Sequence, residues 1–191
     1  MFEKFDFYIA EVGSEKVVLV VTDNAGVMRA TWRKIREKHP HIYAIGCGSH
    51  GLNLLFKDIL KLNPFVVLVQ KAKLVVKIRK RRQLYAIFKS KQKSKYGKKK
   101  RALIMPSPTR FSGAYFMFDS IVKNKQALQE TVLAEEVYVP ADLRSIVLDN
   151  SGFWDILTFA VGYLKPIADG THLVEGDSAR LSQIVAVCMR T

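Results

Sequence analysis

The chain has 191 residues, with 31 Lys or Arg against 17 Asp or Glu and a formal net charge of +14. Its hydrophobic fraction of 49% is enough for the packed core of about one domain, which argues against wholesale disorder. Two cysteines, Cys47 and Cys188, cannot form a disulfide scaffold and fit a reducing compartment. The sequence has no long apolar run and no leader-like start, so we expect neither secretion nor a membrane span.

The excess positive charge is concentrated in one stretch. Fifteen Lys or Arg and no Asp or Glu lie in residues 71–101, and the rest of the chain holds 16 basic and 17 acidic residues. Such a block indicates a polyanionic ligand, with nucleic acid favoured over an anionic membrane surface; a solvated, non-specific linker is the alternative. The strongest candidate contacts are Lys77, Arg79, Lys80, Arg81, Arg82, Lys98, Lys99, Lys100 and Arg101. The same two clusters are typical of nuclear-import signals and predict a nuclear protein.

The first sixty residues show the pattern of an α/β sheet. Spacing predicts a helix over 2–12, a strand over 16–22 that is apolar on both faces and therefore buried, and a helix over 25–38. This helix should turn Val27, Ala30, Thr31 and Ile35 inward. A second strand over 41–45 and a helix from Gly46 onward complete a strand–helix–strand–helix order, which favours parallel pairing.

The remainder is predicted to be helical. One long basic amphipathic helix is expected over 65–90, followed by a charged, mobile segment over 89–101. Further helices are expected over 112–130, 140–149, 151–168 with a kink at Pro166, and 178–189.

Asp23 directly follows the first predicted strand. The carboxyl edge of a parallel sheet is where such folds place ligands and metals, so Asp23 is a candidate metal ligand. Aspartate is also a common helix N-cap, and by frequency the capping role is favoured.

Four potential zinc ligands lie close together: His39, His41, Cys47 and His50. Their spacing matches no standard zinc module, so structural zinc is not favoured. His50 alone, at a helix start beside the sheet edge, could reach a phosphate. Further on, Arg110 could clamp a phosphate and Phe111 could stack on a base, although an ordinary helix start with Phe111 in the core is the simpler interpretation.

Several of these segments together resemble the hAT (hobo–Activator–Tam) DNA transposases, and most closely the plant- and oomycete-type group that carries a conserved segment of unknown function. The resemblance rests on VTDNA at 21–25, HPHI at 39–42, GCGSHGLNL at 46–54 with KD at 57–58, PTRF at 108–111, KNK at 123–125 and LVEGD at 173–177.

The resemblance implies a partial RNase H-like core followed by a mostly helical insertion. Members of the family use three carboxylates to hold two Mg²⁺ or Mn²⁺ ions for phosphodiester cleavage and strand transfer. Asp23 corresponds to the second carboxylate, and Cys47 and His50 to a Cys-x-x-His element beside the scissile phosphate. Arg110 and Phe111 correspond to an Arg-Trp pair that contacts a flipped base, with Phe in place of Trp.

The other two carboxylates are expected outside residues 1–191, and Glu175 and Asp177 are poor substitutes. The expectation is therefore a truncated, transposase-derived chain that binds DNA non-specifically, holds the metal weakly and lacks strand transfer. We expect 1–62 to form the partial core, 63–105 a basic helix and linker, and 106–191 the insertion-like region. The alternatives are a domesticated nuclear module that binds a protein partner, and part of an active transposase with missing exons.

Overall fold

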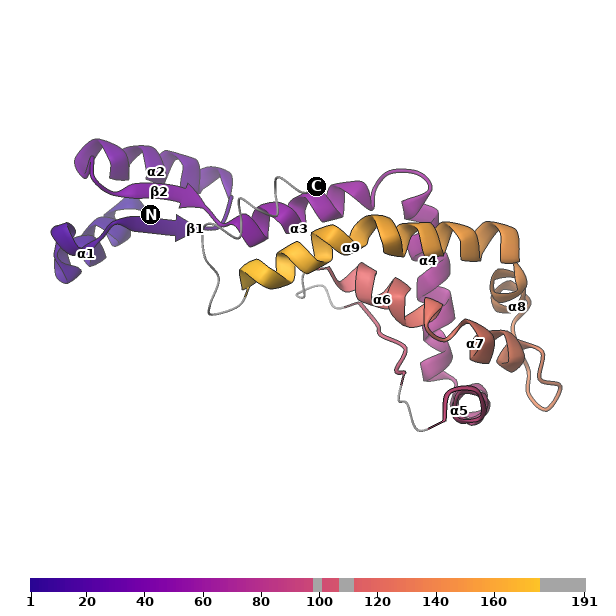
Figure 1. The fold of residues 1–191 in the computed structure, drawn as a ribbon. Coiled ribbons are helices and arrows are strands. Elements are labelled where there is room, and N and C mark those ends of the chain that lie inside the picture. The colour runs from indigo at the N-terminus through magenta and orange to yellow at the C-terminus, as the bar shows by residue number, and fades with distance from the viewer. Residues whose placement is uncertain (98–100, 107–111, 176–191) are drawn as a thin grey trace.

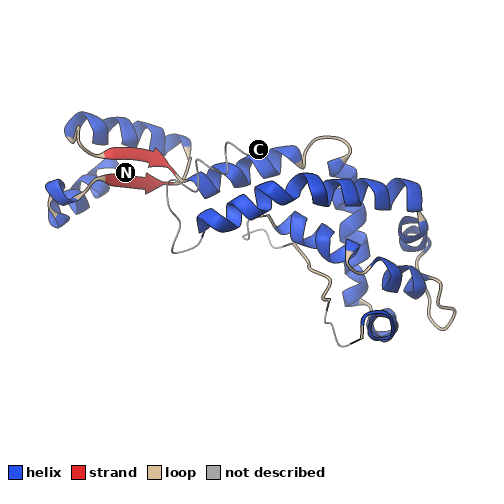
Figure 2. Cartoon of the chain, viewed as in Figure 1, coloured by secondary structure: helices blue, strands red, loops and turns tan. Residues whose placement is uncertain are grey.

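The computed structural model describes residues 1–97, 101–106 and 112–175. Within these ranges the protein is mostly helical, with one small parallel sheet (Figures 1 and 2). The sheet and its helices form one end of an elongated molecule, and the remaining helices form the other (Figure 1). The prediction of an α/β chain is confirmed at this level, with helices dominating the described part.

The sheet end consists of α1 (Phe2–Val12), β1 (Leu19–Thr22), α2 (Gly26–Lys38) and β2 (Tyr43–Gly46). A short 3-10 turn, η1 (Ser14–Lys16), joins α1 to β1. The two strands pair in parallel, with Leu19 opposite Tyr43 and Thr22 opposite Gly46. The predicted helix over 2–12 and the parallel strand order are confirmed.

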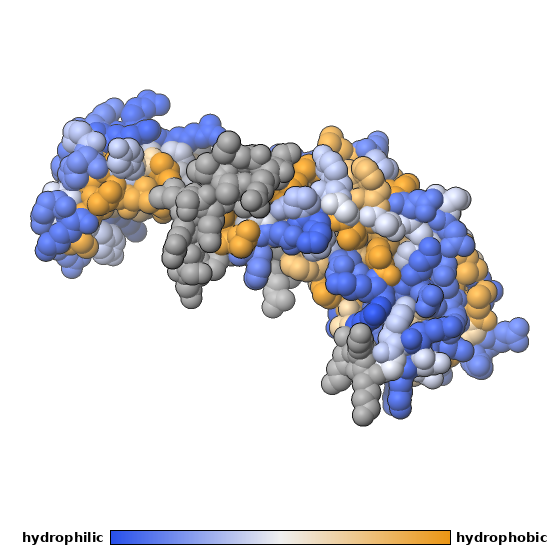
Figure 3. Space-filling model, in the orientation of Figure 1, coloured by the Kyte–Doolittle hydropathy of each residue, from blue (hydrophilic) through white to orange (hydrophobic). Residues whose placement is uncertain are grey.

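The core of this end is small and lies on one face of the sheet. Ile9 of α1, Ile35 of α2, Ala44 of β2 and Ile42, which directly precedes β2, form it. The opposite face exposes Leu19, Val21, Tyr43 and Ile45, and Figure 3 shows hydrophobic surface over the strands.

Two details of the prediction for this end are wrong. The first strand is not buried, because among the described residues β2 is its only neighbour and α1 and α2 cover only one face; Val21 is 50% exposed. On α2, Thr31 and Ile35 are buried as predicted, but Val27 is 57% exposed and Ala30 is also exposed. The narrow sheet covers only part of the helix.

The helical end starts with α3 (Gly48–Ile59), whose Phe56 belongs to the larger core of the molecule. Next come α4 (Phe65–Val76), a 3-10 turn η2 (Lys77–Lys80) and α5 (Arg82–Tyr96). The chain continues with α6 (Gly113–Val122), α7 (Lys125–Val132) and α8 (Ala141–Leu148). A single π-helical turn, η3 (Asn150–Trp154), leads into α9 (Asp155–Glu175), and Pro166 lies inside this last helix.

The predicted single helix over 65–90 is wrong. The chain turns at η2, where Ile78 is 1% exposed and enters the core while the cations around it stay outside. With the turn in place, Ile78 of η2 and Leu84 and Phe88 of α5 pack into the same core as α4. The predicted mobile segment over 89–101 is also wrong in its first part, because α5 extends to Tyr96.

A buried polar network fastens α5 to the segment between α6 and α7. Gln92 donates to Asn124 Oδ1 at 2.7 Å and to the Arg101 carbonyl. Asn124, which is fully buried, donates to the carbonyls of Arg101 and Ser120 at 3.0 and 2.8 Å. The three segments therefore hold one another in place through amide hydrogen bonds shielded from water.

Candidate functional site

The first candidate site is the carboxyl edge of the sheet, where β1 and β2 end side by side. Asp23 follows β1 directly and is exposed, and its Oδ1 accepts a hydrogen bond from the amide of Ala25 at 3.1 Å. Helix α2 begins with Ala25 as its N-cap and has no side-chain cap. Asp23 therefore organises the loop between strand and helix while remaining open to solvent.

Two residues that were not singled out from the sequence hold this edge together. Asn24 Nδ2 donates to the Cys47 carbonyl at 3.3 Å, and Trp32 Nε1 donates to Thr22 Oγ1 at 2.9 Å. The amide of Cys47 also donates to the Thr22 carbonyl at 2.7 Å. The loops after the two strands are thus joined by side chains as well as by the ladder. Of the two, Asn24 could have been found from the sequence, because it lies next to Asp23.

Gly46 has a spatial reason to be glycine. A β-carbon built there would overlap Asn24 Oδ1 and would come within 3.1 Å of the Trp32 ring. The Asn24 side chain therefore occupies the space in which any other residue at 46 would place its side chain.

Cys47 and His50 lie at the start of α3, on the same edge. Cys47 is the N-cap of α3 and is half-buried, and His50 lies in the first turn and is also half-buried. Ser49, between them, donates from Oγ to the Val174 carbonyl at 3.1 Å, which attaches the start of α3 to the end of α9. Asp23, Cys47 and His50 are thus gathered at one end of the sheet by the parallel topology.

His39 and His41 lie at the opposite edge, where β2 begins. His39 Nε2 is 3.0 Å from Asp6 Oδ1, and His41 Nε2 is 2.8 Å from the Ser14 carbonyl. Strand β2 separates these two rings from Cys47 and His50, so the four zinc candidates do not converge. The hydrogen bond from Lys38, followed by the one from His39, lowers the pKa of Asp6.

The donor set at Asp23 does not fit the two-metal site that the family resemblance implies. Within residues 1–97, 101–106 and 112–175, no group of three or more His, Cys, Asp or Glu is placed to hold a metal ion. The carboxylate of Asp23 is instead bonded to a backbone amide. One exposed carboxylate does not provide the ligands of two divalent ions.

The second candidate site is the cationic corner, which we define as Lys77, Arg79, Lys80, Arg81 and Arg82. All five are exposed, and none forms an ion pair with a described residue. They surround the buried Ile78 at the turn between α4 and α5, so the fold holds their backbone in one place. Five close like charges without counterions form a strong positive field that an anionic ligand would relieve.

Two other cations of the basic block, Lys95 and Arg101, have partners. Lys95 pairs with Glu130 at 2.6 Å, and this contact raises the pKa of Lys95. Arg101 donates to the Lys123 carbonyl at 2.8 Å and stacks over the Tyr96 ring at 4.1 Å. Arg101 therefore has structural contacts of its own, in contrast to the cationic corner.

Several predicted residues lie outside the described part of the chain: Lys98, Lys99, Lys100, Arg110, Phe111, Asp177 and Cys188. The predicted helix over 178–189 lies there as well. No described helix is long and apolar enough to cross a membrane.

Comparison with known proteins adds one match. Residues 1–75 match a family described as a domain of unknown function (DUF659). The matched stretch contains the whole sheet end, α3 and nearly all of α4, and it stops before the cationic corner. Neither a curated protein nor a solved structure matches the chain.

Proposed function

We propose that the protein binds nucleic acid without sequence specificity, through phosphate contacts made by the cationic corner. The observation that carries the proposal is the exposure of five cations around Ile78 with no ion pair to a described residue. Cations that neutralise phosphates release condensed counterions, which supplies most of the free energy of non-specific binding.

We also propose that the sheet end derives from a hAT-type transposase core with an RNase H-like arrangement. The DUF659 match covers both sequence segments that carry the resemblance most specifically, VTDNA at 21–25 and GCGSHGLNL at 46–54. The parallel β1–α2–β2 unit supports the proposal, since both segments follow its strands at one edge. Asn24, Gly46 and Cys47 then serve to hold that edge together.

We propose that the protein binds DNA but does not catalyse strand transfer. Cleavage by the family's chemistry uses two divalent ions, Mg²⁺ or Mn²⁺, and among the described residues no group of three or more His, Cys, Asp or Glu is placed to hold a metal ion. DNA is the proposed partner. The nucleus is the proposed location, because the cationic corner is an exposed basic cluster of the import-signal type.

The test is a neutralising variant of the corner, with Arg79, Lys80, Arg81 and Arg82 all changed to Gln. Affinity for a random 20-base-pair duplex is measured by fluorescence anisotropy at several salt concentrations, and it should fall. The slope of log K against log salt should become shallower by about 0.9 for each phosphate that the variant no longer neutralises.

The matched control changes Arg29, Arg33, Lys34 and Arg36 of α2 to Gln, which removes the same charge from an equally exposed helix. Equal reductions of affinity and slope in both variants would contradict the assignment to the corner, because they would show that only net charge matters.

A second candidate function, contact with a protein partner, is favoured by the open face of the sheet. Val21 and Ile45 are 50% and 37% exposed on that face, beside Tyr43, and exposed apolar patches mark contact surfaces. Val21→Thr with Ile45→Thr keeps β-branched residues and should leave DNA affinity unchanged. A reduced DNA affinity in this variant would place the sheet face in the nucleic-acid interface and remove the second candidate.

A further inference from the structure

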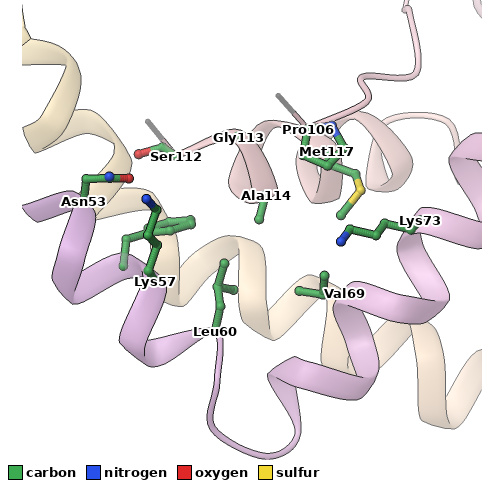
Figure 4. Close-up of a pocket in the computed structure, with 11 residues that line it drawn as sticks. Asn53, Lys57, Leu60, Val69, Lys73, Pro106, Ser112, Gly113, Ala114 and Met117 are labelled. Atoms are coloured by element: carbon green, nitrogen blue, oxygen red, sulfur yellow. The ribbon is translucent and has the colours of Figure 1, made fainter. Parts of the chain in front are cut away.

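A cavity of about 380 Å³ lies where α3, α4 and α6 meet (Figure 4). Its apolar wall includes Phe56, Val69 and Met117, and two lysines from different helices border it, Lys57 of α3 and Lys73 of α4. Neither lysine forms an ion pair with a described residue, and no Asp or Glu is among the described residues that line the cavity. The cavity therefore carries positive charge without a counterion.

Ser112 adds a buried hydroxyl that lacks a partner. The residue is 3% exposed and lines the cavity, and its Oγ has no hydrogen bond with the described part of the protein. In Figure 4 its side chain lies at the end of the cavity where Asn53 and Lys57 are also found. A buried hydroxyl without a partner is uncommon in folded proteins and needs an explanation.

The start of α6 lacks the usual side-chain cap. Ser112 is its N-cap, but with φ 54 it is left-handed rather than extended, and its hydroxyl accepts no bond from the first turn. The first-turn amides of Gly113 and Ala114, which also line the cavity, have no partner within the helix. Amides without an intrahelical partner, at the positive end of a helix dipole, favour an anion.

We propose that this cavity is a binding site for a phosphate monoester. The Ser112 hydroxyl and the first amides of α6 donate to the phosphate oxygens, and Lys57, which lies at the same end of the cavity, balances the charge. The apolar wall accommodates the organic part of the ester. The site does not use the cationic corner, so it can hold whether or not the corner binds DNA.

The phosphate could be a free small molecule or the 5′ end of a nucleic acid. Isothermal titration of the full chain with inorganic phosphate and with a deoxynucleoside monophosphate tests the shared chemistry. Saturable binding of one equivalent is expected, and Ser112→Ala and Lys57→Gln should each weaken it at least about fivefold. A 5′-phosphorylated oligonucleotide compared with its 5′-hydroxyl counterpart identifies the source. An advantage for the former points to nucleic-acid ends, and no advantage points to free phosphates.

A matched pair of control variants, Ser151→Ala and Lys4→Gln, changes exposed residues outside the cavity and should leave phosphate binding unchanged. Thermal melting separates binding from folding. Ser112→Ala removes an unpaired buried hydroxyl, so its melting temperature should not fall even though its phosphate affinity does.

Absence of saturable phosphate binding by the unaltered chain would overturn the proposal, as would equal binding by Lys57→Gln and the unaltered chain. Reduced duplex affinity in the corner variant with phosphate binding retained would support the proposed function and leave this site standing. Phosphate binding by a chain that does not bind duplex DNA would contradict the proposed function alone.

Discussion

At the scale of single residues, the tightest constraint lies at Gly46. The Asn24 side chain fills the space beside it and bonds the Cys47 carbonyl, so the loops after β1 and β2 depend on the absence of a side chain there. We expect Gly46→Ala to lower the free energy of unfolding by about 1–3 kcal/mol, because the new methyl group displaces Asn24. Urea denaturation followed by circular dichroism measures the change.

Gly26→Ala is the control for that measurement. A β-carbon at Gly26 meets nothing within 4 Å, and the residue starts α2. The variant should be as stable as the unaltered chain or slightly more stable. Equal stability of Gly46→Ala and the unaltered chain would show that Asn24 is not held as described.

Asp6 is a single residue that makes the stability of the fold depend on pH. Its pKa is lowered mainly by the hydrogen bond from Lys38 and then by the one from His39. A carboxylate with a lowered folded-state pKa contributes stability above the pKa of the unfolded state and loses it as pH falls through the folded value. Between about pH 5 and pH 3, the unaltered chain should therefore lose more stability than Asp6→Asn.

Melting temperatures measured across that pH range test the prediction. Lys38→Gln removes the larger cause and should give a profile between those of the unaltered chain and Asp6→Asn. Parallel profiles for all three chains would contradict the role assigned to this cluster, which joins α1 to the end of α2.

At the scale of elements, the amide network of Gln92, Asn124 and Arg101 joins α5 to the α6–α7 segment. Asn124→Ala leaves the Arg101 carbonyl with one donor fewer and removes the acceptor for Gln92. We expect the free energy of unfolding to fall by about 1–3 kcal/mol.

Asn150→Ala serves as the control, since Asn150 is exposed and its Oδ1 accepts a solvent-exposed hydrogen bond from Gln129 Nε2 at 2.9 Å. Its effect should stay within about 0.5 kcal/mol. A comparable destabilisation in both variants, measured by urea denaturation, would contradict the structural role of the network.

In the sheet end, the existence and order of the helices and strands followed from local patterns, whereas their burial did not; in the helical end, the helices predicted over 65–90 and 112–130 are each divided in two. Apolar spacing predicted α1, α2 and the two strands, because the helical and the strand periodicity of apolar residues are both properties of short segments. The break at Ile78 could not be predicted in this way, since Lys77 and Arg79 fit a continuous basic helix equally well. The turn exists because α4 and α5 pack against different neighbours in the tertiary structure.

The candidate site shows the same division. Placement of Asp23, Cys47 and His50 at one edge follows from parallel pairing, which the sequence pattern favoured. The hydrogen bonds of Asn24 and Trp32 join positions far apart in the chain and depend on side-chain direction, which periodicity does not encode. The buried hydroxyl of Ser112 likewise depends on the meeting of α3, α4 and α6.

At the scale of the whole molecule, the two ends differ in how they are stabilised. The sheet end has four buried core residues, and the helical end has a far larger cluster that includes Phe56, Phe88, Phe118 and Trp154. We expect native-state hydrogen exchange to show earlier opening in β1 and β2 than in α4 and α6, because less buried apolar surface holds the strands. Uniform protection across both ends would contradict the division into a small and a large core.

Charge is also divided across the molecule, since the basic block of 71–101 carries the whole excess and its exposed corner lies at the α4–α5 turn. The most direct test of nucleic-acid binding is the salt dependence of affinity for random duplex DNA, measured with the unaltered chain. We predict a linear fall of log K with log salt, with a slope of about −3 to −5 if most of the five corner cations each meet a phosphate. A slope near zero, or no binding at low salt, would contradict binding through the cationic corner.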